Sequence, residues 1–214
     1  LAITTLPGGV AYLALAGGID APRQLGSRST YERAMIGGIG GRIIAVGNRL
    51  PCRIVDHAQG ESQAPRWRLA DDPLRVVLGP QNEHFKQQAI AVFLGSDYVV
   101  TNQRDRMGMR LEGTPLEHIT PASADIVSDG VTPGTIQVPG NGQPIILLAD
   151  CQTVGGYPKI ATVICADLPR LAQLQPGQSV RFAVVSRAAA RQALLEREAQ
   201  WQAWAGRIGA IAPD

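Results

Sequence analysis

Short apolar runs separated by Gly- and Pro-rich turns dominate this chain, and they predict a protein built mainly of β-strands. β-branched residues are frequent in the runs, as is usual for strands. Pro7-Gly8-Gly9 reads as a hairpin turn between the first two runs. The chain shows no alternation of strand and helix that would indicate βαβ units, so we expect a β-barrel with few helices. The apolar runs occupy residues 2–6, 10–16, 42–46, 74–78, 98–101, 136–138, 145–149, 160–164 and 180–185.

Helical patterns are rare. Residues 188–204 predict the one long helix, with Ser186 as a candidate N-cap. Three- and four-residue spacing connects Leu194, Leu195, Glu198, Trp201 and Trp204. Residues 83–88 predict a short helix. Residues 104–113 alternate charged and apolar side chains and are read either as an edge strand or as an exposed turn.

Residues 57–72 are polar and contain Gly60 and Pro65, which indicates a linker or a long surface loop. We therefore expect two parts: residues 1–60 as the remainder of a first β domain, and residues 73–214 as a β-barrel domain with a C-terminal helix. The chain starts at Leu1 without a Met and runs directly into a strand pattern, so we expect it to be a truncated fragment.

Composition narrows the class of protein. The net charge of +2 over 214 residues gives no electrostatic footprint for nucleic acid. No apolar run reaches the ~18 residues of a membrane span. The three cysteines form no CxxC pair and no zinc spacing, and an odd number argues against a disulfide framework, so a reducing cytoplasm is the expected location.

Residues 137–159 form the most unusual stretch, because two loops there are dense in glycine and in amide side chains. Asp150 and Lys159 add one charge of each sign. This excess of neutral donors and acceptors suits a small polar ligand with carbonyl or amide edges; ordinary turns of a β protein are the alternative. The candidate ligand-binding residues are Gln137, Asn141, Gln143, Gln152, Thr153, Gly155, Gly156 and Tyr157.

Other motifs are weaker. Residues 37–41 (GGIGG) match no phosphate-binding fingerprint and are read as close backbone packing at a barrel corner. The histidines are scattered, so we expect no metal site, and no nucleophile motif occurs. Among the arginines, Arg28 and Arg106 remain open between anion binding and surface ion pairs. Arg104 and Arg110 are read as solvated or paired with nearby acids.

Five motifs, taken together, resemble the biotin-dependent carboxyltransferase-like family, which includes the C subunit of 5-oxoprolinase, KipA and allophanate hydrolase subunit 2. The family is also similar to part of the carboxyltransferase domain of urea carboxylase. The motifs span nearly the whole chain in the expected order: YLALAGGI (12–19), GSRSTYERAMIGGIGGR (26–42), LRVVLGPQ (74–81), DRMGMRLEG (105–113) and the run 134–182.

This resemblance implies a cyclophilin-like β-barrel and a subunit of an ATP-dependent 5-oxoprolinase that opens 5-oxoproline to glutamate. A second implied function is the carboxyltransferase half of a urea-type carboxylase. Since the chain has no biotin-attachment motif, carboxybiotin would then come from another chain or domain. A third is a KipA-like regulatory protein that acts on a kinase inhibitor. The implied partners are the KipI-like B subunit, together with the lactam-utilisation A subunit. We expect the chain to be inactive alone.

The predicted site lies where the two loops of residues 137–143 and 150–159 converge. Lys159 is predicted to stabilise negative charge that develops on a carbonyl or ureido oxygen. Asp150 is predicted either to orient Lys159 or to bond loop N–H groups. The amide side chains would bind the amide edges of the ligand, and the Tyr157 ring would pack against one side of it. Arg28 and Ser29 of the GSRST motif would also contact the ligand.

Overall fold

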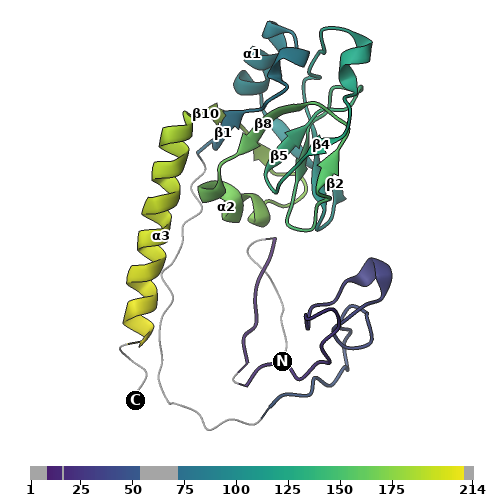
Figure 1. Cartoon of the computed structure of the whole chain (residues 1–214), viewed down its shortest axis with the longest axis vertical. Helices are drawn as coiled ribbons and strands as arrows, with labels where there is room; N and C mark the ends of the chain where they lie inside the picture. Colours follow the sequence, from purple (N-terminus) through teal and green to yellow (C-terminus); the bar gives the residue numbers. More distant parts are fainter. Residues whose placement is uncertain (1–8, 16, 54–71, 210–214) are drawn as a thin grey trace. The chain divides into compact units, whose positions relative to one another are not determined.

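The structure, a computed structural model, describes residues 9–15, 17–53 and 72–209, and these form two compact units (Figure 1). The first unit contains residues 9–11 and 72–209, and the second contains residues 12–15 and 17–53.

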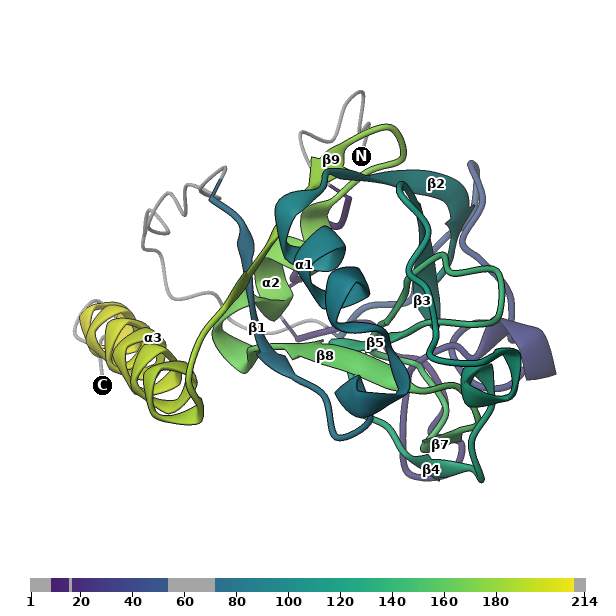
Figure 2. The ribbon, with the colours of Figure 1, turned by 90° about the horizontal axis from the view of Figure 1, so that it is seen from above.

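An eight-stranded sheet forms the body of the first unit, in the order β10-β1-β8-β5-β6-β3-β2-β9. Neighbouring strands pair antiparallel except β1 and β10, which are parallel. Figure 2 shows the strands curving around a common centre in a nearly closed, barrel-like arrangement. The strands are β1 Leu74–Leu78, β2 Tyr98–Arg104, β3 Gly108–Glu112, β5 Thr135–Gln137, β6 Ile145–Leu147, β8 Lys159–Val163, β9 Ser179–Val180 and β10 Phe182–Val184.

Alternating residues of these strands build the core. Met109 and Leu111 on β3 and Ile146 on β6 are almost completely buried, because successive residues of a strand point to opposite faces of the sheet. Helix α1 (Gln87–Gly95) lies over the middle of the ring of strands in Figure 2. Its Phe93 stacks on Phe182 with ring centroids 4.5 Å apart. Each such buried side chain contributes about 1.5–3 kcal/mol to folding.

A small second sheet flanks the barrel, formed by β4 (Asp129–Gly130) and β7 (Val154–Gly155). Short 3-10 helices complete the connections of the first unit: η2 Asn82–His84, η3 Pro121–Ala124 and η4 Cys165–Asp167. Helix α2 (Leu168–Gln173) follows η4 directly.

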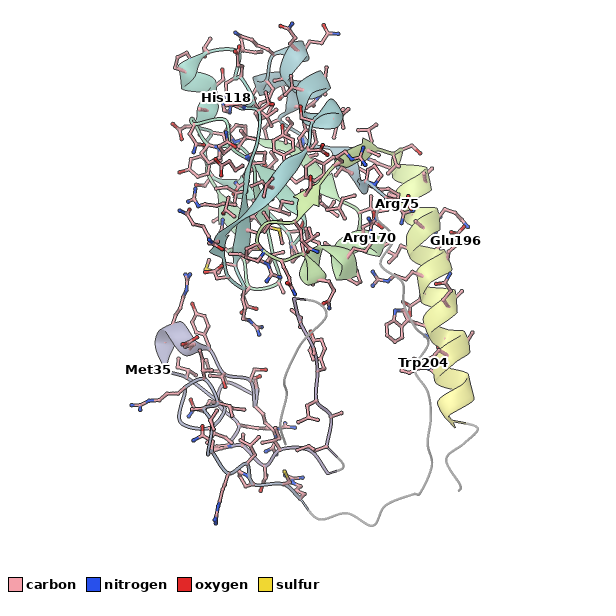
Figure 3. The ribbon with its side chains drawn as sticks, turned by 180° about the vertical axis from the view of Figure 1, so that it is seen from behind. Met35, Arg75, His118, Arg170, Glu196 and Trp204 are labelled. Carbon is pink, nitrogen blue, oxygen red and sulfur yellow. The ribbon has the colours of Figure 1, made fainter. Side chains whose placement is uncertain are left out.

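Helix α3 (Arg187–Gly209) stands beside the barrel and packs against η4 and β1 (Figure 1). The hydroxyl of Ser186 accepts a hydrogen bond from the N–H of Ala189 at 3.1 Å, which confirms the predicted N-cap. Figure 3 shows Arg75 of β1 and Arg170 of α2 on the side of the barrel next to α3, and Glu196 on α3 itself.

No strand forms at 42–46 or at residues 10–15, the described part of the run 10–16, so those two predictions are wrong. The second unit contains isolated β-bridges and the 3-10 helix η1 (Glu32–Ala34). Among its described residues one apolar side chain, Ala21, is buried, which leaves no core for strands to pack on. Glycine is required at Gly37 and Gly41, where φ is positive. A Cβ at these positions would lie 2.0 Å from the carbonyl oxygen of Ser29 and 2.1 Å from that of Met35. Close backbone packing at GGIGG therefore exists, but it lies outside the barrel strands.

The fold class, mainly β with few helices, is confirmed. The runs at 74–78, 98–101, 136–138, 145–149, 160–164 and 180–185 all contain strands. Residues 83–88 do not form one helix: η2 ends at His84 and α1 begins at Gln87. Residues 104–113 form a turn followed by β3, which is an interior strand between β2 and β6 and not an edge. The first strand of the predicted hairpin (2–6), most of its turn and nearly all of the 57–72 segment lie outside the described residues.

Candidate functional site

A cavity of about 470 Å³ lies against the face of the sheet opposite the core. Gly108 and Arg110 line it, and they alternate along β3 with the buried Met109 and Leu111. Ile145 and Leu147 of β6 form its apolar floor. The remaining lining residues are mostly polar: Asn102, Gln103, Arg104, Asp105, Met107, Gln137, Gln152 and Tyr157. A cavity of this size with an apolar floor and polar groups around it suits a small polar ligand.

Gln137 is the most deeply placed amide of the cavity, with 3% of the residue exposed. Its Nε2 donates a hydrogen bond to the carbonyl oxygen of Tyr157 at 3.1 Å. Because a carbonyl can only accept, this bond fixes which end of the amide faces Tyr157. A Cβ on Gly155 would lie 2.6 Å from the same Nε2, so the glycine leaves room for the Gln137 side chain.

Three of the predicted residues, Gln137, Gln152 and Tyr157, are therefore brought together at one cavity. Gln152 is exposed and Tyr157 is 40% exposed, so both can meet a ligand that enters from solvent. The amides of Gln137 and Gln152 thus lie at the same cavity as the Tyr157 ring, and their role in binding a ligand stays a prediction.

Lys159 lies next to this cavity and is not among the residues that line it. It is 3% exposed, and its ammonium donates to Asp129 Oδ2 at 2.5 Å and to the carbonyl oxygen of Gly130 at 3.2 Å. Gln81 braces the pair: its Nε2 donates to Asp129 Oδ2, and its Oε1 accepts from the backbone N–H of Lys159. The hydrogen bond from Lys159 lowers the pKa of the Asp129 carboxyl below its usual value.

Asp150 does not orient Lys159. Its carboxylate forms a two-pronged ion pair with Arg106, with Nε–Oδ2 at 2.5 Å and Nη2–Oδ1 at 3.0 Å. The hydrogen bond from Arg106 lowers the pKa of Asp150. The predicted Asp150–Lys159 pairing is thus wrong, because each charge has another partner, and Arg106 forms an ion pair on the surface.

Asn141 and Gln143 have local structural roles away from the cavity. Gln143 clamps Gly113 on both sides, since its Oε1 accepts from the Gly113 N–H at 3.0 Å and its Nε2 donates to the Gly113 carbonyl at 3.1 Å. Asn141 Oδ1 accepts from the backbone N–H of Gln143 and stabilises the turn.

Thr153 and Gly156 hold neighbouring loops through their main chains. The Thr153 carbonyl accepts from Val131 at 3.0 Å, and the Gly156 carbonyl accepts from Ile126 at 2.8 Å. Neither residue lines the cavity. The structure therefore brings only part of the predicted amide-rich set to the cavity.

Arg28 and Ser29 belong to the second unit. Arg28 forms an ion pair with Asp20 at 3.2 Å and donates to the Ala21 carbonyl. The backbone N–H of Ser29 donates to Ser27 Oγ at 3.1 Å. Their contribution to the ligand site stays a prediction.

Sequence reasoning missed Asn102, Gln103 and Arg110 as cavity residues, and it missed Asp129 as the partner of Lys159. For Arg110 the sequence does contain a signal, since apolar Met109 and Leu111 alternate with Gly108 and Arg110. This alternation places Arg110 on the face opposite the core once β3 is known to be an interior strand. No signal in the sequence connects Asp129 with Lys159, because β4 approaches β8 through tertiary structure.

Within residues 9–15, 17–53 and 72–209, no cluster of three or more His, Cys, Asp or Glu side chains is suited to a metal ion. No helix in the same part of the chain is both long and apolar enough to cross a membrane.

Comparison with known proteins defines the family. Residues 1–184 match the family model for the carboxyltransferase domain, subdomains A and B, and the chain belongs to this family. The chain is 39% identical over 197 residues to the C subunit of 5-oxoprolinase from Escherichia coli (strain K12), covering 92% of this chain and 63% of the relative. It is 40% identical over 179 residues to the C subunit of 5-oxoprolinase from Haemophilus influenzae, covering 82% of this chain and 56% of the relative.

A solved structure shows the same likeness. The crystal structure of the Kluyveromyces lactis urea carboxylase matches with a TM-score of 0.70 and 27% sequence identity, covering 82% of this chain and 18% of that chain. The chain spans less than two thirds of the length of the two 5-oxoprolinase relatives.

Proposed function

We propose that this chain is part of the C subunit of an ATP-dependent 5-oxoprolinase and that its cavity holds the lactam that the complex opens to glutamate. The observation that carries the proposal is the 39% identity to the Escherichia coli relative over 92% of the chain. The amide-lined cavity supports it, since a lactam presents one carbonyl acceptor and one N–H donor to such groups.

Within the cavity, Gln137 and Gln152 bind the amide edges of the ligand, and Tyr157 forms a wall. We assign Lys159 a positioning role in place of direct contact with developing charge. Its pair with Asp129 ties β8 to β4, β4 pairs with β7, and Gly155 of β7 lies against the amide of Gln137. Loss of the Lys159–Asp129 pair would therefore move β4 and β7, and with them the glycine that lies against the Gln137 side chain.

The partners in this proposal are the KipI-like B subunit, together with the lactam-utilisation A subunit, and the complex consumes ATP. Cys52, Cys151 and Cys165 are all free thiols, which fits a cytoplasmic complex. Co-expression of the full-length protein with both partners should give ATP hydrolysis that depends on 5-oxoproline, while this chain alone should give none. A complete complex without 5-oxoproline-dependent ATP hydrolysis would contradict the proposal.

A second candidate function is the carboxyltransferase step of a biotin-dependent urea-type carboxylase, with carboxybiotin supplied by another chain or domain. The structural match to urea carboxylase favours it. In the same assay, urea-dependent ATP hydrolysis with a biotin carboxylase partner, and none with 5-oxoproline, would identify this function. Binding to a kinase inhibitor without turnover of either substrate would identify a KipA-like regulatory protein.

A further inference from the structure

One row of side chains crosses three strands on the floor of the cavity. Arg110 on β3 lies opposite Ile145 on β6, and Ile145 lies opposite Gln137 on β5. Neighbouring strands are about 4.8 Å apart, so the Cα atoms of Arg110 and Gln137 are separated by roughly 10 Å. Both residues line the cavity, so one small ligand over Ile145 can meet both side chains.

Arg110 is the cation of this cavity that has no protein partner among the described residues. The guanidinium of Arg104 donates to the Ala172 carbonyl at 2.8 Å, which directs it toward helix α2. The Asp105 carboxylate accepts from the backbone N–H groups of Met107 and Gly108 and so stabilises the β2–β3 turn. Arg110 is exposed, and a guanidinium of this kind pairs well with a carboxylate.

Gln137 supplies the complementary neutral group. Its Nε2 is bonded to the Tyr157 carbonyl, which leaves Oε1 as an acceptor with no partner in the described part of the chain. This oxygen is not closed off from solvent, so the N–H of a ligand in the cavity can donate a hydrogen bond to it. The row therefore offers an N–H acceptor at one end and a carboxylate partner at the other.

We propose that Arg110 is the residue that selects the substrate: it binds the carboxylate of a small amide whose N–H donates to Gln137 Oε1. This inference rests on the proposed function, because it takes the cavity as the substrate site. 5-Oxoproline carries both groups on adjacent atoms, whereas urea carries N–H groups and no carboxylate. Arg110 would therefore favour the lactam acid over neutral amides.

The test measures binding to the full chain by calorimetric titration with 5-oxoproline and with 2-pyrrolidinone, the same lactam ring without the carboxylate. For Arg110→Gln, we expect the Kd for 5-oxoproline to rise about 10- to 100-fold, the range expected for a lost charge-assisted bond. The Kd for 2-pyrrolidinone should stay unchanged. Arg110→Lys should recover part of the loss, and Arg191→Gln, at an exposed arginine of α3, should match wild type.

Three results would overturn this role of Arg110: wild-type affinity for 5-oxoproline in Arg110→Gln, an equal loss for both ligands, or no binding of either ligand by the wild-type chain. The two proposals fail separately. If the complex hydrolyses ATP with 5-oxoproline and Arg110→Gln changes nothing, only the role of Arg110 is wrong. If 5-oxoproline binds through Arg110 but the complex does not turn it over, only the proposed function is wrong.

Discussion

The ammonium of Lys159, almost completely buried, lies 2.5 Å from the carboxylate of Asp129, whose side chain is 54% exposed. This difference in exposure determines how much stability is lost when one partner of the ion pair is removed. Lys159 without a carboxylate remains a charge away from water, whereas Asp129 without an ammonium can be solvated.

Asp129→Asn should consequently destabilise the protein more than Lys159→Met, although both remove the same ion pair. Denaturant midpoints of the two variants and of the double variant measure this, and the double variant should be more stable than Asp129→Asn. Equal midpoints for the two single variants would show that Lys159 reaches water without Asp129.

The positioning role of Lys159 has a kinetic consequence in the full complex. Both Lys159→Met and Asp129→Asn should lower turnover of 5-oxoproline, because either change releases β4 and the support of Gln137. A lysine in direct contact with developing charge would behave differently: its replacement alone would cost about 10²–10³ in rate, and Asp129→Asn would leave turnover near that of wild type. The second pattern would contradict the positioning role.

Asp167 anchors the first strand to the segment before α2. It is 1% exposed and accepts three hydrogen bonds from Arg75, from the backbone N at 2.8 Å, Nε at 3.1 Å and Nη2 at 2.6 Å. Asp167→Asn should lower the free energy of unfolding by about 2 kcal/mol, since charged hydrogen bonds in a buried site are lost.

Asp97→Asn is the matched control for Asp167, because Asp97 pairs with Arg181 on the surface with both side chains at least 60% exposed. An exposed pair of this kind contributes at most about 1 kcal/mol, and often nothing measurable. Urea unfolding of both variants gives the comparison, and equal losses would contradict the anchoring role of Asp167.

Burial raises the pKa of Tyr98 from 10.0 to about 12. A raised folded-state pKa contributes stability that is fully present below pH 10 and is lost as the pH rises toward 12. Tyr98→Phe removes this dependence, so its unfolding free energy should fall less steeply than that of wild type between pH 10 and 12. Below pH 10 the variant should lose only the weak hydrogen bond from the Tyr98 hydroxyl to the Thr114 carbonyl at 3.3 Å. Parallel curves in the alkaline range would show that the Tyr98 hydroxyl reaches solvent.

The sequence was most informative where one local pattern decided the outcome. The strands at residues 74–78 and 160–164 follow from dense β-branched content, and the cap at Ser186 follows from its place before a helical pattern. The same reasoning located Gln137, Gln152 and Tyr157, because amides and glycines concentrate in two loops that the barrel brings together.

Tertiary contacts explain the errors. Asp150 is close to Lys159 in the sequence, but in the fold the β2–β3 turn places Arg106 beside Asp150, and these two residues form the ion pair. Arg110 is exposed, as expected of a solvated charge. That it also lines the cavity could not be predicted, because this placement depends on β3 having a strand on each side. Asn141 and Gln143 matched the composition of a ligand loop, yet their side chains are bonded to nearby backbone.

We propose that the cavity around Gln137 binds a small amide, and the side-chain amide signals of the glutamines test this binding most directly. In a ¹⁵N NMR titration of the chain with 5-oxoproline, the NH₂ signals of Gln137 and Gln152 should shift in a saturable way. Those of Gln143, bonded to Gly113, and of the exposed Gln192 on α3 should stay in place. Saturable shifts at Gln143 or Gln192, with Gln137 and Gln152 unmoved, would contradict the claim.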